Sequence, residues 1–240
     1  MRCSLPVSSR LSRLALVLLP SVLWTLPVQA GRPLGTDDAG TAGARTCQVE
    51  TWFERSQDLR AWTASPACGL GDAVELGLEF SRPSPSALAG ERHSLGVALK
   101  WVDPGWKLGE VQFGLKAHGG TARQLAGGWA AGGRGLLGLA SVGLPQQFTL
   151  HVNLGDEYDR DARRHRGVAQ AALTWQPAPA WLLFGEAQAV RGTGGAQQTL
   201  GLRHWLLADT LGLDVTGGRT AGAPGSTVWT VGLGWYGIGY

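Results

Sequence analysis

The sequence lacks the segments from which helical proteins and helical membrane spans are built. After residue 30, no stretch approaches 18 consecutive apolar residues, which excludes a transmembrane helix in that part of the chain. No segment carries the i, i+3, i+4, i+7 apolar stripe of an amphipathic helix. The chain instead contains 37 glycines and 11 tryptophans among its 240 residues, a composition that disfavours a helical protein. The fold class that remains is all-β.

An excess of charge of one sign is also missing. The formal net charge of +3 includes three arginines within residues 1–30, which contain no acidic residue. Removing that segment leaves 18 basic and 18 acidic residues, so the high isoelectric point says nothing about nucleic acid. No Lys/Arg run or aromatic-basic cluster points to a nucleic-acid partner either.

The first 30 residues have the pattern of a secretory signal peptide. Basic residues precede an apolar run from Leu14 to Leu26, and Val28-Gln29-Ala30 supplies the small residues of a cleavage site. We therefore expect residues 1–30 to be a signal peptide, cleaved near Ala30. Residues 31–45 would then be an N-terminal periplasmic or plug segment, and residues 46–240 one large β domain.

Period-two alternation predicts the strands of that domain. In residues 74–81, for example, Val74, Leu76, Leu78 and Phe80 share one face, and the polar or small residues share the other. Twelve strands are predicted, near residues 47–56, 59–68, 73–82, 93–102, 108–117, 132–143, 146–155, 166–176, 181–190, 196–207, 210–218 and 227–240. Boundaries inside the Gly-rich stretch 118–143 are the least defined.

The connections favour an up-and-down barrel that spans an outer membrane. Tight turns (GLGD, DPGW, LPQ, PAPA and LAD) follow every second strand, whereas the other connections, such as RPSPSALAGER, HGGTARQLAGG and GDEYDRDARRHR, are longer. Short turns on the periplasmic rim and long loops on the other are the rule for bacterial outer-membrane barrels. The predicted fold is a transmembrane antiparallel up-and-down β-barrel of about 12 strands. A soluble secreted β-barrel would show the same alternation.

Tryptophans gather beside the tight turns. Of the ten tryptophans after residue 30, half lie next to a predicted tight turn: Trp101, Trp106, Trp175, Trp181 and Trp205. We expect these five to form an aromatic girdle at the periplasmic interface of the membrane.

Two cysteines remain after residue 30. If the first hairpin turns at Gln57-Asp58, Cys47 lies opposite Cys68 and Phe53 lies opposite Trp62. In an oxidising compartment this register predicts a cross-strand disulfide worth about 3 kcal/mol in the chain-entropy model. Two unpaired thiols are the alternative, because opposed strand positions do not always meet disulfide geometry.

The C-terminal stretch TVWTVGLGWYGIGY alternates up to the last residue. Outer-membrane β-barrels end in this way, with a terminal aromatic that serves as an assembly signal. That association suggests Tyr236, Ile238 and Tyr240 as the signal residues. The adjacent Trp235 and Tyr236 break the alternation, so that either a β-bulge resets the phase or the last residues hang below the barrel.

Three motifs resemble a known family. RPLGTDDAG at 32–40, TCQVETWFE at 46–54 and CGLGDAVELGLEF at 68–80 are similar to segments of the outer-membrane β-barrel family labelled MetA-pathway phenol-degradation or putative transporter proteins. Cys68 departs from that pattern, since an aromatic residue is commoner there. The resemblance implies an outer-membrane channel or uptake protein, often associated with hydrophobic or aromatic compounds.

If the apolar faces meet lipid, the polar faces line a mildly acidic lumen. The expected lumen-lining charges are Glu75, Glu79, Lys100, Glu110, Lys116, His151, Glu186, Arg203 and Asp214, together with Glu50 and Glu54. They fit a cation-tolerant pore or, equally, a salt-bridged network that fills a narrow barrel.

Catalytic and metal-binding signals are weak. The five histidines are scattered without metal-ligand spacing, and no serine has a nucleophile motif. Asp37-Asp38 is more typical of a turn than of a calcium site. We therefore expect no catalytic residues, no metal and no cofactor.

The leading hypothesis is a passive outer-membrane channel or uptake protein for small molecules, with aromatic or hydrophobic compounds as candidates. The alternatives are a plugged structural or adhesive barrel and a soluble β-barrel that binds a small ligand. Expected partners are outer-membrane lipid and lipopolysaccharide, the barrel-assembly machinery and a small solute. Arginines of the loop DEYDRDARRHR are candidate contacts for lipopolysaccharide phosphates.

Overall fold

The computed structural model describes residues 34–57, 60–84, 93–123, 128–160, 162–193, 195–221 and 227–240. The expected signal peptide, its cleavage site and residues 31–33 lie outside these ranges. The helical residues described are the single 3-10 turn η1 (Pro145–Gln147). No helix among the described residues is long and apolar enough to cross a membrane.

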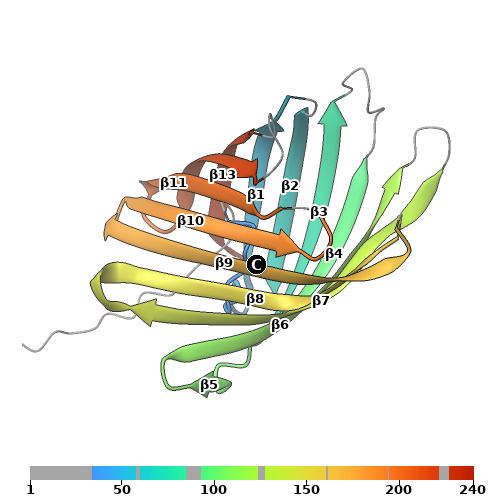
Figure 1. Ribbon diagram of the computed structural model, residues 1–240. Coiled ribbons are helices and arrows are strands. Elements are labelled where there is room, and N and C mark those ends of the chain that lie inside the picture. The colour runs from blue at the N-terminus through green and yellow to red at the C-terminus, as the bar shows by residue number, and fades with distance from the viewer. Residues whose placement is uncertain are drawn as a thin grey trace, which may run out of the picture.

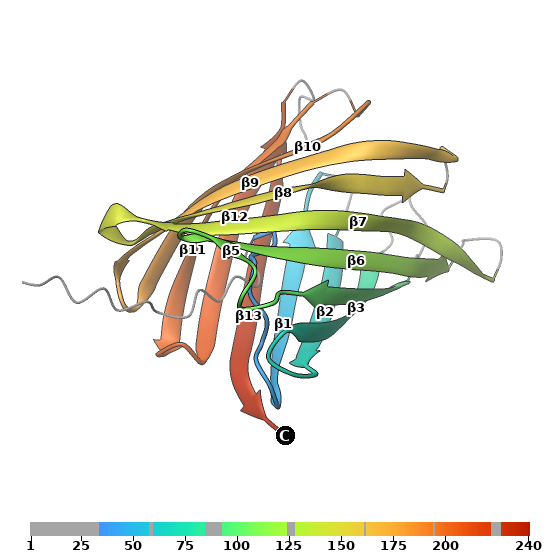
Figure 2. The ribbon, with the colours of Figure 1, turned by 90° about the horizontal axis from the view of Figure 1, so that it is seen from below.

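Twelve long antiparallel strands close into a barrel (Figures 1 and 2). Each strand pairs with its neighbours in the chain, and β1 and β13 pair to join the two ends. The strands are β1 (Thr46–Arg55), β2 (Arg60–Gly69), β3 (Val74–Ser84), β4 (Ser94–Trp101), β6 (Val111–Arg123), β7 (Trp129–Leu144), β8 (Phe148–Asp159), β9 (Arg164–Ala178), β10 (Trp181–Val190), β11 (Gln197–Leu207), β12 (Leu211–Thr220) and β13 (Val228–Gly239). A two-residue strand, β5 (Lys107–Leu108), pairs only with β6 and stands outside the barrel wall. The all-β barrel predicted from alternation is confirmed.

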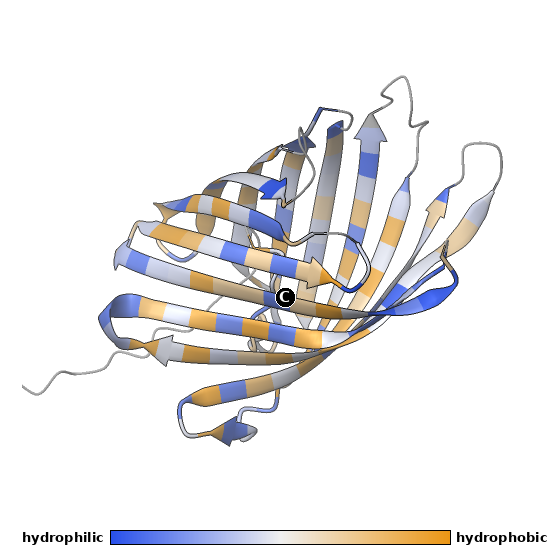
Figure 3. Cartoon of the chain, in the orientation of Figure 1, coloured by the Kyte–Doolittle hydropathy of each residue, from blue (hydrophilic) through white to orange (hydrophobic). Residues whose placement is uncertain are grey.

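The outer surface of the barrel is apolar. In β13, Trp229, Val231, Leu233 and Trp235 are exposed, whereas the alternate residues Thr230 to Tyr236 are buried inside. The same alternation of apolar and polar residues runs along most strands (Figure 3). An apolar surface of this extent is costly in water and is the surface that a bilayer covers in a transmembrane barrel.

The two rims differ in their connections. The short-turn rim carries residues 70–73, 145–147, 179–180 and 208–210, together with 102–110 between β4 and β6. The expected tight turn DPGW is therefore wrong in part, because β5 folds back on β6 before the chain re-enters the wall. At the long-loop rim, β6, β8 and β9 extend into segments that we expected to be loops.

Close backbone packing explains why the Gly-rich stretch stays in a strand. A Cβ at Gly120 would lie 2.8 Å from the carbonyl oxygen of Leu95 on β4, so only glycine fits there. The pairing of β6 with β7 shifts by one residue between Gly119 and Thr121 and then continues to Arg123. Glycine here permits a bulge and does not end the strand.

A β-bulge near the C-terminus resets the alternation of β13. Cys47 pairs with Ile238 and Val49 pairs with Trp235, which leaves Tyr236 and Gly237 opposite a single residue of β1. Gly237 takes a φ of +70°, which glycine adopts without strain. Of the two sequence-based alternatives, the bulge is the one that forms.

The first hairpin has the register expected from the sequence. Cys47 pairs with Cys68 and Phe53 pairs with Trp62. A disulfide joins Cys47 and Cys68 near the short-turn rim. The bond links β1 and β2 next to the seam where β1 meets β13.

Candidate functional site

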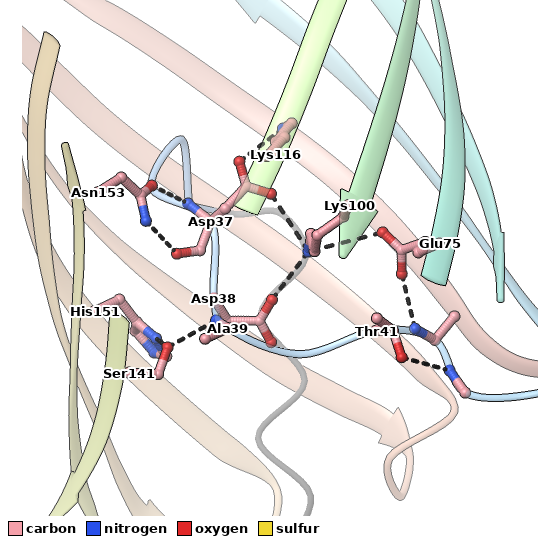
Figure 4. A network of polar contacts seen from close by, with 12 residues as sticks. Asp37, Asp38, Ala39, Thr41, Glu75, Lys100, Lys116, Ser141, His151 and Asn153 are labelled. Carbon is pink, nitrogen blue, oxygen red and sulfur yellow. Dashed lines mark hydrogen bonds and ion pairs between the residues drawn. The ribbon is translucent and has the colours of Figure 1, made fainter. Parts of the chain in front are cut away.

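The N-terminal residues 34–45 lie inside the barrel before the chain enters β1. Leu34, Thr36, Asp38 and Ala39 are each less than a tenth exposed. Their neighbours come from wall strands that are far away in the chain, such as β7, β8 and β10 (Figures 1 and 4). We call residues 34–45 the inner segment.

Lysines of the wall bind the two aspartates of the inner segment. Lys100 of β4 donates to Oδ1 of Asp38 at 3.1 Å, and its Nζ lies 3.4 Å from Oδ1 of Asp37. Lys116 of β6 donates to Oδ2 of Asp37 at 2.6 Å. Glu75 of β3 adds a third carboxylate, 3.7 Å from the Lys100 ammonium. Figure 4 shows both lysines pointing from one side of the barrel at the aspartates.

This ionic cluster stabilises the charged form of Asp37. Burial raises the pKa of the Asp37 carboxyl, but the ammonium groups of Lys116 and Lys100 lower it more, so the pKa falls below its usual value of 3.8. Asp37 is therefore an anion at neutral pH, and its attraction to the wall depends on that charge.

Polar side chains of the wall also bind the backbone of the inner segment. Asn153 accepts the N–H of Asp37 and donates to its carbonyl oxygen, at 2.7 and 2.9 Å. Ser141 accepts the N–H of Ala39 at 2.8 Å. A buried extended peptide needs such partners, because its N–H and C=O groups have none of their own.

Two carboxylates complete the backbone contacts. Glu186 of β10 accepts the N–H of Gly35 and both the N–H and the hydroxyl of Thr36. Glu75 accepts the N–H of Ala42 at 2.7 Å. The inner segment is thus bound along its length by side chains from opposite parts of the wall.

Apolar contacts are fewer. Leu34 packs with Ala172 and Phe184 of the wall. Ala39 packs against three inward-facing apolar residues, Leu137, Leu139 and Val168. The inner segment therefore fits the lumen by shape as well as by charge.

A cavity of about 350 Å³ adjoins the inner segment. Its lining includes Asp37, Lys100 and Lys116, and continues to Glu79 and His118. Since β3 runs from the short-turn rim to the long-loop rim, Glu79 lies farther toward the long loops than Glu75. The cavity extends from Gln48 and Ala67, near the short-turn ends of β1 and β2, to Glu79 and His118 nearer the long loops, and residues 34–37 of the inner segment form part of its lining.

A second buried network lies on the other side of the lumen. Arg203 of β11 donates through Nε and a terminal nitrogen to the two carboxylate oxygens of Asp214 on β12, at 2.6 and 2.9 Å. Tyr236 of β13 donates to Glu50 of β1 at 2.5 Å. The Arg203 guanidinium lies 4.9 Å from the ring centres of both Trp205 and Tyr236. These contacts tie β11, β12, β13 and β1 together at the barrel seam.

Comparison with protein families gives one match. Residues 19–234 match the model of a family described as "Uncharacterised conserved protein UCP029691". The chain belongs to this family. A search of curated protein sequences finds no match. The more specific MetA-pathway resemblance is not confirmed.

Solved structures similar to this family member are outer-membrane barrels. The KdgM porin has a TM-score of 0.60 and 10% sequence identity, with 78% of this chain and 98% of the porin covered. The NanC porin has a TM-score of 0.55 and 8% identity, with 79% and 98% covered. Outer membrane phospholipase A from Escherichia coli has a TM-score of 0.51 and 11% identity, with 81% and 94% covered. At these identities the comparison shows a shared fold.

The structure places most of the expected lumen charges on the inner face. Glu75, Lys100, His151, Glu186, Arg203 and Asp214 are buried there, and Lys116 and Glu79 line the cavity. Glu110 is an exception: it is exposed in the turn between β5 and β6, because the β5 hairpin interrupts the alternation on which its assignment relied.

The expected aromatic girdle is wrong at one position. Trp101, Trp106, Trp175 and Trp181 are exposed near the short-turn rim. Trp205 instead faces the lumen with Arg203, two residues earlier on β11, and packs edge-on against Tyr236. Of the expected assembly-signal residues, Tyr236 is buried in the lumen, Ile238 pairs with Cys47, and Tyr240 donates its hydroxyl to the carbonyl of Gly69.

Sequence reasoning missed the role of Asp37-Asp38. The pair does not act as an isolated turn former, because its carboxylates bind Lys100 and Lys116. The signal was present in two places: an acidic pair just before the first strand, and lysines at inward positions of two adjacent strands. Only the fold brings them together.

Ser141 and His151 form a hydroxyl–imidazole pair, with Ser141 Oγ and His151 Nδ1 2.8 Å apart. The serine hydroxyl also accepts the N–H of Ala39, and His151 is fully buried behind the inner segment. The pair therefore acts here as a ligand of the segment backbone. Among the described residues, no group of His, Cys, Asp or Glu has the arrangement of a metal site.

Proposed function

We propose that this protein is an outer-membrane channel for small solutes whose lumen is closed by its own inner segment. The observation that carries the proposal is the occupied polar lumen. The wall binds residues 35–42 through at least six side chains, and most of these contacts are ionic or hydrogen-bonded. A purely structural core would be expected to be packed mainly by apolar side chains.

The nature of the contacts supports a segment that leaves the lumen as a unit. Polar contacts to an extended peptide can be exchanged for water when the segment leaves, because every group involved is well hydrated in solution. The adjoining cavity already extends from the ionic cluster toward the long-loop rim. Release of the inner segment would widen that cavity and open a continuous polar path through the lumen.

The cellular setting is part of the proposal and is supported by the fold. An apolar exterior and an inward polar face suit the outer membrane of a Gram-negative bacterium, reached after cleavage near Ala30. Lipid and lipopolysaccharide would then cover the exterior, and the barrel-assembly machinery would insert it with the help of the residues after Trp235. The exposed Arg163 and Arg164 at the long-loop rim are candidate contacts for lipopolysaccharide phosphates.

The substrate class is a further part of the proposal. The family resemblance of residues 32–40 and 68–80 suggests hydrophobic or aromatic compounds. The KdgM porin, of the same fold, has been solved in complex with disordered oligogalacturonate. A liposome-swelling series with sugars, cations, phenols and aromatic acids would separate these classes.

A plugged structural barrel without transport is the second candidate. It is favoured by the Arg203–Asp214 and Tyr236–Glu50 network, which strengthens the barrel seam independently of the inner segment. A soluble ligand-binding barrel is disfavoured by the exposed tryptophans and leucines of the outer face.

Single-channel recording in planar bilayers tests the proposal. The mature protein should conduct rarely, and a variant without residues 34–43 should conduct persistently. D37N/D38N should lie between them, and D209N, an exposed aspartate in the turn after β11, should behave like the parent. A folded deletion variant, recognised by heat-modifiable gel mobility, that stays as silent as the parent would rule out the channel.

A further inference from the structure

We propose that Lys100 and Lys116 form a binding site for solutes that carry two neighbouring carboxylates, and that Asp37-Asp38 occupies this site as an internal ligand. A dicarboxylate that takes the lysines would displace the inner segment and open the channel. This inference rests on the proposed function and adds to it the chemical class of the opening solute.

The charge of the cluster is the first argument. With the inner segment in place, the two ammonium groups lie within 4 Å of three carboxylates, those of Asp37, Asp38 and Glu75. Without it, only Glu75 remains beside Lys100. Among the described residues, Asp37 is the one ion-pair partner of Lys116. Confined ammonium groups that lose their partners require replacement anions.

Access is the second argument. The cavity is lined by Lys100, Lys116 and Asp37 while the inner segment is still docked. The side chain of Lys116 is 24% exposed and that of Asp37 is 18% exposed, whereas Lys100 is 7% exposed. A solute in the cavity therefore contacts the more exposed Lys116–Asp37 pair more readily than Lys100, which becomes accessible as the segment withdraws.

The number of carboxylates is the third argument. The carboxylate of Asp37 bridges both lysines, and that of Asp38 takes a further contact with Lys100. The tethered aspartates also have a high effective concentration, since they are joined to β1 by a short linker. A single carboxylate can replace that of Asp37 but leaves the contact between Asp38 and Lys100 in place, so it loses this competition. Two linked carboxylates replace the carboxylates of both aspartates in one binding event.

The remaining wall ligands do not favour a small solute. Asn153, Ser141 and Glu186 bind backbone N–H and C=O groups, which a simple dicarboxylate lacks. Recognition of the solute would thus be restricted to the lysine pair. Recognition of the segment involves the entire wall, which explains how the closed state is restored when the solute leaves.

The test uses succinate and butyrate, which have the same carbon chain and differ in the second carboxylate. In the variant lacking residues 34–43, succinate should bind at least about tenfold more tightly than butyrate, by calorimetry and by block of the current. The capped dipeptide Asp-Asp should bind, and capped Asn-Asn should not. K116Q should weaken succinate binding by about tenfold or more, whereas K107Q, at an exposed lysine of β5, should leave it unchanged.

The intact mature protein gives the second readout. Succinate should raise its rate of opening, and butyrate at the same concentration and ionic strength should not. Equal binding of succinate and butyrate, or succinate binding that K116Q leaves intact, would overturn the inference. A deletion variant that binds succinate but never conducts would instead refute the channel and leave the lysine site standing.

Discussion

Oδ2 of Asp37 lies 2.6 Å from Nζ of Lys116, which joins the N-terminal part of the chain to the inner face of β6, 79 residues away. The pair is neither fully buried nor fully exposed, and it borders the cavity. It is therefore the contact at which release of the inner segment would begin.

The coupling between these two residues is measurable. D37N and K116Q should each raise the ratio of open to closed channel, and the double variant should raise it little beyond either single change. We expect a coupling energy on the order of 1–2 kcal/mol, between the values of exposed and buried ion pairs. The single-channel open probabilities of the parent, D37N, K116Q and the double variant give this coupling energy as a double-mutant cycle. Strict additivity would show that the two side chains act independently.

Acid should open the channel. The pKa of Asp37 is lower in the docked segment than its usual 3.8, so the docked state binds fewer protons than the released state. The stabilisation by Asp37 is therefore fully present above that value and is lost as the pH falls below it through the docked pKa. Recordings between pH 6 and pH 3 should show opening at the acid end. D37N should remove much of the pH dependence of opening. If the pH profile of D37N equals that of the parent, the role of Asp37 is contradicted.

Loss of the disulfide should affect stability more than gating. Cys47 and Cys68 are separated by 21 residues, a loop for which the chain-entropy model gives about 3 kcal/mol. C47A/C68A should lower the free energy of unfolding in urea by that order and leave the open probability unchanged, since Cys47 and Cys68 share the outer face of the wall with the exposed Phe53 and Trp62 and do not point into the lumen. Two reactive thiols in the unreduced, denatured parent protein would show that the bond is absent in the cell.

The Arg203–Asp214 pair should stabilise the barrel itself. D214N removes the negative charge that accepts two hydrogen bonds from the fully buried guanidinium, and we expect a loss of about 3–5 kcal/mol. D209N, an exposed change in the same hairpin, is the matched control. The unfolding midpoints of the two variants, measured in the same detergent, provide the comparison; equal midpoints would contradict the assigned role of the pair.

The sequence predicts the strands of the barrel wall much better than the conformation of the residues inside the lumen. Period-two alternation is a local signal, and it correctly predicted the twelve long strands and the pairing of Cys47 with Cys68. Trp205 has the same parity as Arg203, an expected lumen residue, and this parity determines its orientation although it lies close to a turn. Glu110 was expected in the lumen but lies in the turn of the β5–β6 hairpin, which the alternation of apolar and polar residues does not predict.

The inner segment was predicted only as one possibility among several. Residues 34–45 have no periodicity of their own, and their conformation is set by contacts with strands up to 151 residues away. Such contacts depend on which wall residues face inward and on how far along the barrel axis each of them lies. Both are determined only when the barrel is closed and the register of its strands is known.

The most direct test ties the inner segment to the wall and then releases it. The N–H of Ala39 lies 2.8 Å from Oγ of Ser141, so positions 39 and 141 are close enough for A39C/S141C to be tried as a tether, with formation of the bond checked by thiol titration before recording. In the D37N/D38N background, the oxidised protein should stay closed, and a reducing agent should open it. The same background without the added cysteines controls for reduction of Cys47–Cys68. Equal conductance before and after reduction of the tethered protein would contradict the claim that residues 34–45 close the channel.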